Sequence, residues 1–198
     1  PTSHFLSIPS GLNRTCEGKS ERRYFEGLKR LLRNPGVLVE LVDDAGSAPI
    51  SVVDRGLEER HRARREREPY DSVWCVFDLD QHESFYRSVD KARANSLNLA
   101  ISVICFEFWI LLHYTNTSRP FPNCDNVLKE LQARNNSYEK TSVSDELLAL
   151  RRFAMERAER LARDNKKAKP SEPWPNPSTT VHELVRYLEE LVPYELPA

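Results

Sequence analysis

Apolar residues along the chain alternate between two spacings through residue 103. Helical spacing marks residues 21–33, the segment that begins at Pro49, and residues 83–94. Short apolar runs typical of buried strands occupy residues 37–42, 72–77 and 98–103. Strand and helix therefore alternate, which predicts right-handed crossovers and a mainly parallel α/β sheet flanked by helices. Residues 106–114 are aromatic and apolar, which predicts a buried helix.

The second half of the chain has a different pattern. Polar residues dominate from Thr115 to Asp125, and helices are predicted near residues 125–134 and 144–168. A proline-rich connector, residues 170–177, leads to a last helix that is capped by Ser178 or a neighbouring threonine. We therefore expect an α/β core in residues 1–115 and a helical extension in residues 116–198, packed together as one compact unit.

Composition limits the classes of protein to consider. A chain of 198 residues is long enough to bury a real core, and its net charge of −1 gives it no overall attraction to nucleic acid. Residues 147–170 carry eight Lys or Arg against three acids. This segment could contact phosphates, but a solvated helix face is the commoner meaning of such a run. Its candidate nucleic-acid contacts are Arg151, Arg152, Lys166 and Lys167.

The sequence also predicts a cytoplasmic protein with no membrane association. Its apolar runs stay below the roughly 18 residues that a spanning helix needs, and no signal peptide is recognised. The cysteines at positions 16, 75, 105 and 124 show no CxxC spacing. We therefore expect reduced thiols rather than a disulfide framework.

Asp78-Leu79-Asp80 is the most informative chemical feature, because it ends the apolar run of residues 73–77. Two carboxylates at the carboxyl end of a buried strand face the crevice where open α/β sheets bind ligands. Holding them partly desolvated requires a cation or a proton, and Mg²⁺ or Mn²⁺ suits such hard oxygen ligands. A solvated loop with two helix-capping acids is the alternative, and the pair alone does not decide between them.

A second acidic position, Glu17, precedes the first predicted helix and is followed by Gly18. In a parallel sheet this turn and the Asp78 turn emerge at the same edge, so three carboxylates would converge and clamp a phosphodiester through metal ions. Glu21 would line the same helix end, although an acid that complements the helix dipole explains it better. Pro9 and Gly11 oppose a central strand before Glu17. Either a short strand lies near residues 12–16, or this N-terminus is unusual.

Longer motifs connect these positions to a known family. The segments CEGKSE, YFEGL, AGSAP, VFDLDQH, CFEFWILLH, SYEK and NPSTTVHELV resemble the motif series of the RloB-like family. The core of that family is similar to the Toprim fold, which it shares with OLD-family nucleases. Toprim domains pair a Glu after the first strand with Asp-x-Asp after the third, and they perform metal-dependent phosphoryl transfer on nucleic acid. The resemblance implies these roles for Glu17, Asp78 and Asp80.

Other positions in the matching motifs are candidates with open alternatives. Glu107 is an odd residue among aromatics unless it faces the acidic site, so we favour a catalytic or metal-supporting role. Lys140 could offset charge on the reacting phosphate, against the alternative of a solvated lysine. Supporting roles are weighed against purely structural ones for His82, His113, Ser178 and His182. Thr179 and Thr180 could join Ser178 in binding phosphate at a helix start, but simple capping explains Ser178 equally well.

The sequence and the resemblance together predict a Mg²⁺- or Mn²⁺-dependent endonuclease acting on nucleic acid. The resemblance further implies bacterial defence against phage beside an ABC-type ATPase, with RNA, and tRNA in particular, as the target. The alternative is a non-catalytic regulatory or binding subunit of such an ATPase complex. Another phosphoryl-transfer activity is a weaker option, because no GxxxxGK[ST] motif is present. A homo-oligomer is compatible with the sequence, which does not fix the oligomeric state.

Overall fold

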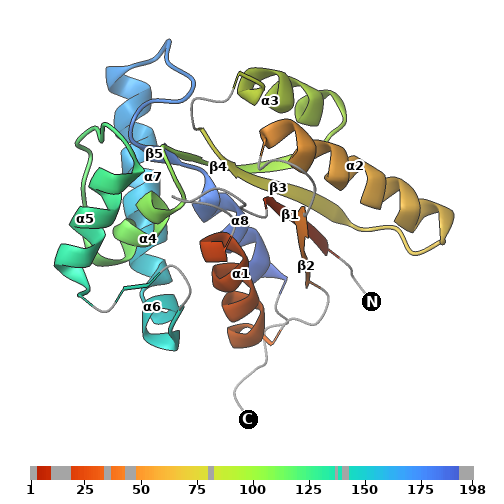
Figure 1. Cartoon of the computed structure of the whole chain (residues 1–198), viewed down its shortest axis with the longest axis horizontal. Coiled ribbons are helices and arrows are strands. Elements are labelled where there is room, and N and C mark those ends of the chain that lie inside the picture. The colour runs from red at the N-terminus through yellow and green to blue at the C-terminus, as the bar shows by residue number, and fades with distance from the viewer. Residues whose placement is uncertain are drawn as a thin grey trace.

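A five-stranded sheet forms the centre of the computed structural model (Figure 1). The structure describes residues 4–9, 19–33, 37–42, 48–79, 83–136, 138–139 and 143–191. The strand order is β2-β1-β3-β4-β5. The strands are β1 (His4–Pro9), β2 (Val37–Val42), β3 (Ser72–Asp78), β4 (Asn98–Val103) and β5 (Ser178–Thr179). The first four strands are parallel and β5 runs antiparallel to β4, which confirms the predicted, mainly parallel α/β sheet.

Helices cover both faces of this sheet. They are α1 (Lys19–Leu31), α2 (Pro49–Arg65), α3 (Phe85–Ala94), α4 (Glu107–Tyr114), α5 (Cys124–Arg134), α6 (Asp145–Ala149), α7 (Arg151–Ala168) and α8 (Val181–Glu190). Figure 1 shows α2 and α3 along one face and α1 and α8 along the other, while α4 to α7 gather beyond the β5 side. Pro49 occupies the first turn of α2, as its sequence position predicts, because that turn needs no backbone N–H from it.

The residues of β3 alternate between two hydrophobic clusters because successive strand side chains point to opposite faces. Trp74 and Val76 pack with α1, α4 and α8, whereas Val73, Cys75 and Phe77 pack with α2 and α3. All five are buried. A strand covered on both faces reads as a continuous apolar run, which is why residues 72–77 were recognisable as a strand.

The first strand differs from the prediction. Pro9 was expected to oppose a central strand, yet β1, His4–Pro9, is a central strand between β2 and β3. Pro9 is tolerated because it is the last residue of β1. Pairing with β3 covers only residues 4–7, so β3 requires no N–H donor from Pro9. Residues 10–18 lie outside the described residues.

The second half of the chain also differs in detail. The helix predicted over residues 144–168 is two helices, α6 and α7, which meet at Leu150. The short strand β5 follows the connector, and the hydroxyl of Ser144 caps α6 by accepting from the N–H of Leu147. None of the helices in the described part of the chain has the length and apolar character needed to cross a bilayer.

Candidate metal and phosphate site at the carboxyl edge of the sheet

Asp78 is the last residue of β3 and lies half-buried at the carboxyl edge of the parallel strands. It pairs in register with Ser102 of β4. Its Oδ2 accepts a hydrogen bond of 3.1 Å from the backbone N–H of Phe106, the residue that precedes α4. The start of α4 therefore supplies a backbone donor to this carboxylate, as helix starts commonly do for anions.

Glu107, the first residue of α4, is buried at the same edge with 2% of its surface exposed. The hydroxyl of Ser20, in the first turn of α1, donates a hydrogen bond of 2.9 Å to its Oε1. The sequence places a negatively charged residue in an aromatic segment, and the fold provides a polar neighbour for it there. This contact joins two motifs that lie 87 residues apart.

Tyr138 and Glu21 complete this group, which we call the Glu107 cluster: Ser20, Glu21, Glu107 and Tyr138. Burial raises the pKa of the Tyr138 hydroxyl, and the negative charges of Glu107 and Glu21 raise it further, while a hydrogen bond from Ser20 lowers it. Tyr138 therefore stays protonated and can donate a hydrogen bond. Two buried carboxyl groups and a phenol thus lie around the start of α1, the helix that comes directly after Glu17 and Gly18.

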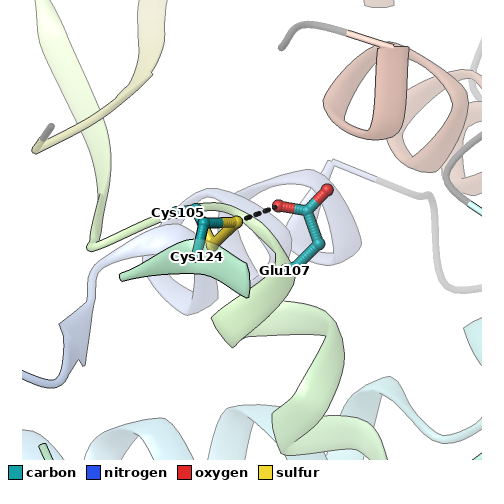
Figure 2. A group of neighbouring side chains, drawn as sticks. All are labelled: Cys105, Glu107 and Cys124. Carbon is teal, nitrogen blue, oxygen red and sulfur yellow. Dashed lines mark hydrogen bonds between the residues drawn. A yellow bond between two sulfur atoms is a disulfide. The ribbon is translucent and has the colours of Figure 1, made fainter. Parts of the chain in front are cut away.

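A disulfide joins Cys105 to Cys124 beside Glu107 (Figure 2). The prediction of reduced thiols is therefore wrong for this pair. Their separation of 19 residues forms no recognisable motif. The fold brings them together: Cys105 lies in the turn between β4 and α4, and Cys124 is the first residue of α5. Oε2 of Glu107 points at this pair and lies 3.5 Å from Sγ of Cys124. Cys75 is free and buried in the sheet, where burial raises the pKa of its thiol to about 12.

Several predicted site residues lie outside the described residues, namely Glu17, Asp80, His82 and Lys140. The structure therefore gives positions to Asp78, Glu107 and Glu21, and it brings the last two together at the start of α1. Asp78 joins them through the Phe106 N–H, one residue before Glu107. The proposed three-carboxylate set remains a prediction.

His113 lies in the core at the far end of α4 rather than at the carboxylates. Its Nδ1 is 3.0 Å from the carbonyl of Trp109, which can only accept, so Nδ1 carries the proton. Its Nε2 then accepts from the hydroxyl of Tyr24 at 3.1 Å. Burial lowers the pKa of His113 to about 3. This environment favours the structural alternative for His113 over a proton carrier at neutral pH.

The segment before α8 also has structural partners. Ser178 lies in β5, and Thr180 occupies the N-cap position of α8, but its side chain makes no capping hydrogen bond. The hydroxyl of Thr180 accepts from the N–H of Ile101, and that of Thr179 lies 3.2 Å from Ser102 Oγ. His182 is buried, its Nδ1 lies 3.1 Å from the carbonyl of Thr179, and burial lowers its pKa. The contacts of Thr179 and Thr180 therefore join the segment before α8 to β4, whose Ser102 pairs with Asp78.

The basic helix α7 is partly committed to structure. Arg151 forms an ion pair of 2.6 Å with Glu189 of α8, and Arg157 donates to the carbonyls of Leu112 and His113. Arg152, Lys166 and Lys167 are exposed. Three of the four predicted nucleic-acid contacts therefore lie on a solvated face, whereas Arg151 packs between helices.

Sequence reasoning missed Ser20 and Tyr138 as parts of this site. A signal was available, because Ser20 belongs to the segment CEGKSE and Tyr138 to SYEK, both of which matched the family motifs.

Carboxylates and hydroxyls of this kind fit Mg²⁺ or Mn²⁺, which prefer hard oxygen ligands and retain water. Cys105, Glu107 and Cys124 form a further group of metal-ligand type, with their ligand atoms within 4.8 Å of one another.

The fold and the site define an α/β protein with acidic residues gathered at the carboxyl edge of a parallel sheet. The family model of RloB-like proteins matches residues 15–188, which is most of the chain. The chain therefore belongs to the RloB-like family. No curated protein and no solved structure was found to match it.

Proposed function

We propose that this protein is a Mg²⁺- or Mn²⁺-dependent nuclease that hydrolyses phosphodiesters in nucleic acid. The position of Asp78 carries the proposal: it ends a central parallel strand, and its neighbour β1 precedes the segment that holds Glu17. Because the loops after parallel strands emerge at one edge of the sheet, Glu17 and Asp80 are expected beside Asp78. Membership of the RloB-like family supports the same assignment.

The residues of this edge suit phosphoryl chemistry. A bound metal ion would polarise the phosphate and activate water, with Glu17, Asp78 and Asp80 as its ligands. Asp78 is oriented by the Phe106 N–H, and Glu107 is oriented by the Ser20 hydroxyl. Tyr138 keeps its proton beside Glu107 and would donate a hydrogen bond to a phosphate oxygen. Lys140, two residues further on, is proposed to offset charge on the reacting phosphate.

The proposed target and biological setting are based on membership of the RloB-like family. RNA, with tRNA favoured, is the proposed target, and the proposed setting is bacterial defence against phage beside an ABC-type ATPase. Arg152, Lys166 and Lys167 are the proposed backbone contacts, since their side chains are exposed on α7. The alternative remains a non-catalytic subunit of such an ATPase complex. Exposed apolar surface on the last helix would favour it, whereas Val181, Leu184, Val185 and Leu188 of α8 are buried.

The test is a cleavage assay with purified protein, alone and with a partner ATPase. tRNA, single-stranded DNA and plasmid are supplied in Mg²⁺ or Mn²⁺, and products are resolved on denaturing gels. Asp78→Asn and Glu17→Gln are expected to reduce the rate by at least about 100-fold, because each removes a charged metal ligand.

Asp71→Asn is the matched control, since Asp71 is exposed and lies just before the opposite end of the same strand. Its rate should stay within about twofold of wild type. Cleavage that survives both Asp78→Asn and Glu17→Gln would refute the site. No cleavage by wild type under any condition, with ATPase binding retained, would favour the regulatory subunit.

A further inference from the structure

Cys105 and Cys124 bring sulfur ligands to Glu107, a ligand chemistry that the proposed nuclease site does not use. Two sulfurs and one carboxylate oxygen lie within 4.8 Å of one another, at the junction of β4, α4 and α5. Thiolates are soft ligands, so they select zinc over the magnesium or manganese expected at Asp78. The two sets of residues therefore differ in the metal that each prefers.

We propose that the reduced protein binds one Zn²⁺ through Sγ of Cys105, Sγ of Cys124 and Oε2 of Glu107. The disulfide is the oxidised, metal-free state of the same site. Three protein ligands leave the fourth tetrahedral position to water, as in zinc sites with an open position.

The distances fit this coordination. Tetrahedral zinc with Zn–S of about 2.3 Å and Zn–O of about 2.0 Å places sulfur and oxygen ligands about 3.5 Å apart. Sγ of Cys124 and Oε2 of Glu107 are already 3.5 Å apart. Two sulfurs on one zinc lie about 3.8 Å apart. Only the two cysteine side chains must separate after reduction, and their Cα atoms, 5.8 Å apart, leave room for that movement.

The surroundings of Glu107 support a ligand role. Ser20 donates to Oε1, the oxygen that does not face the sulfurs, so Oε2 is held toward Cys124 (Figure 2). Outer hydrogen bonds of this kind orient metal-binding carboxylates and strengthen binding. Cys105 and Glu107 are each only 2% exposed, so zinc bound here would be shielded from water on most sides.

The zinc site would also help to hold the carboxyl edge of the sheet in place. Phe106, which donates its N–H to Asp78, lies between the two ligands Cys105 and Glu107. Either the disulfide or zinc would tie this segment to α5 and hold the N–H in place. The site therefore supports Asp78 without being part of the nuclease metal set.

Conversion of the disulfide to the zinc-binding state requires a two-electron reductant. A phosphine reduces the disulfide by taking up the oxygen of one water molecule, which breaks the S–S bond and yields two thiols and one phosphine oxide. Zn²⁺ then displaces the two thiol protons, which pass to buffer, and forms two zinc–sulfur bonds. Hydrogen peroxide would reverse the binding: it takes two electrons from the two thiolates and, with two protons from buffer, becomes two water molecules, while the S–S bond forms and Zn²⁺ is released.

The test uses the whole protein, reduced with a phosphine that is then removed, and titrated with Co²⁺ and Zn²⁺ under argon. We expect one Co²⁺ per chain with a sulfur-to-cobalt charge-transfer band, displaced by one Zn²⁺. Oxidised protein should bind neither ion in this way. Cys124→Ser and Cys105→Ser should lose the band, and Ser20→Ala should weaken zinc binding by about tenfold. Glu107→Gln should weaken it more than Ser20→Ala.

Cys75→Ala and Cys16→Ser are matched controls that remove the other thiols and should keep the band. A measurement on wild-type protein avoids dependence on the folding of variants: zinc should slow alkylation of Cys105 and Cys124, mapped by peptide mass spectrometry. Absence of the band and of protection in reduced wild-type protein would overturn the proposal. A band that persists in Cys124→Ser would overturn it as well.

Discussion

Among single residues, His113 shows how burial fixes a protonation state. The histidine is in contact with Tyr24 and with the carbonyl of Trp109, and burial lowers its pKa to about 3. The nearby charges of Arg157 and Arg151 lower it further. An unfolded histidine has a pKa near 6.5, so the unfolded chain takes up a proton between these two values while the folded protein does not.

This difference predicts a pH-dependent contribution to stability. The contribution of His113 is present above pH 6.5 and is lost as the pH falls toward 3, by about 1.4 kcal/mol per pH unit. Urea unfolding of wild type and His113→Gln between pH 7 and pH 4 measures it: the stability difference should shrink as the pH falls. His61→Gln, on the exposed part of α2, is the control for the removal of an exposed histidine. A constant difference for His113→Gln would contradict the prediction.

The sequence predicted part of the candidate site for clear physical reasons. An acid at the end of an apolar strand, Asp78, and an acid among aromatics, Glu107, are both expensive to bury, so both stood out. The partners of Glu107 could not be predicted, because Ser20 lies 87 residues away and Cys124 lies on another helix. Residue patterns therefore identified the charged groups, while the fold was needed to find the side chains that hold them.

At the level of elements, periodicity predicted most of the helices and the strands β2, β3 and β4, and in β3 and β4 a buried apolar run is the physical reason. It missed β5, since two polar residues after a proline-rich connector carry no period. It also did not predict β1, because Pro9 was taken to oppose a strand that it only ends. The break at Leu150 was missed because the helical pattern continues through it.

Arg157 of α7 stabilises the end of another helix, α4. Its guanidinium donates to the carbonyls of Leu112 and His113 at 2.6 and 2.9 Å, which satisfies acceptors that the helix end leaves open. Arg157→Ala is expected to lower the free energy of unfolding by about 1.5 kcal/mol. Arg160→Ala, exposed on the same helix, should change it by less than about 0.5 kcal/mol. Equal losses in urea titrations would show that the two carbonyl contacts add nothing.

The disulfide links the start of α4 to the start of α5 and closes a loop with a sequence separation of 19. This crosslink restricts the unfolded chain, which adds about 3 kcal/mol to the free energy of unfolding. The free energy of unfolding of oxidised wild type should therefore be higher than that of Cys124→Ser by about that amount, when both are unfolded in the presence of a chelator. Wild type reduced by a phosphine in chelator should match Cys124→Ser. A loss below about 1 kcal/mol in both would argue against this stabilising role of the crosslink.

Across the whole molecule, one sheet separates two hydrophobic clusters and leaves the acidic groups at its carboxyl edge. Trp74 and Val76 pack into one cluster while Cys75 and Phe77 pack into the other, so β3 is held on both faces up to Asp78. Such rigid support would keep a carboxylate in position for a metal ion even before the ion binds. Metal binding at this edge should therefore appear as a gain in global stability.

We expect Mn²⁺ to stabilise the oxidised protein, in which the cysteine pair is closed. At ten times the dissociation constant, binding adds about 1.4 kcal/mol, which corresponds to a rise of about 3–6 °C in Tm. Asp78→Asn should abolish the rise, because the loss of the carboxylate charge removes most of the attraction for the cation, and Asp71→Asn should retain it. Differential scanning calorimetry without nucleic acid measures this directly. An equal rise in Asp78→Asn would place Mn²⁺ elsewhere, whatever the outcome of the cleavage assay.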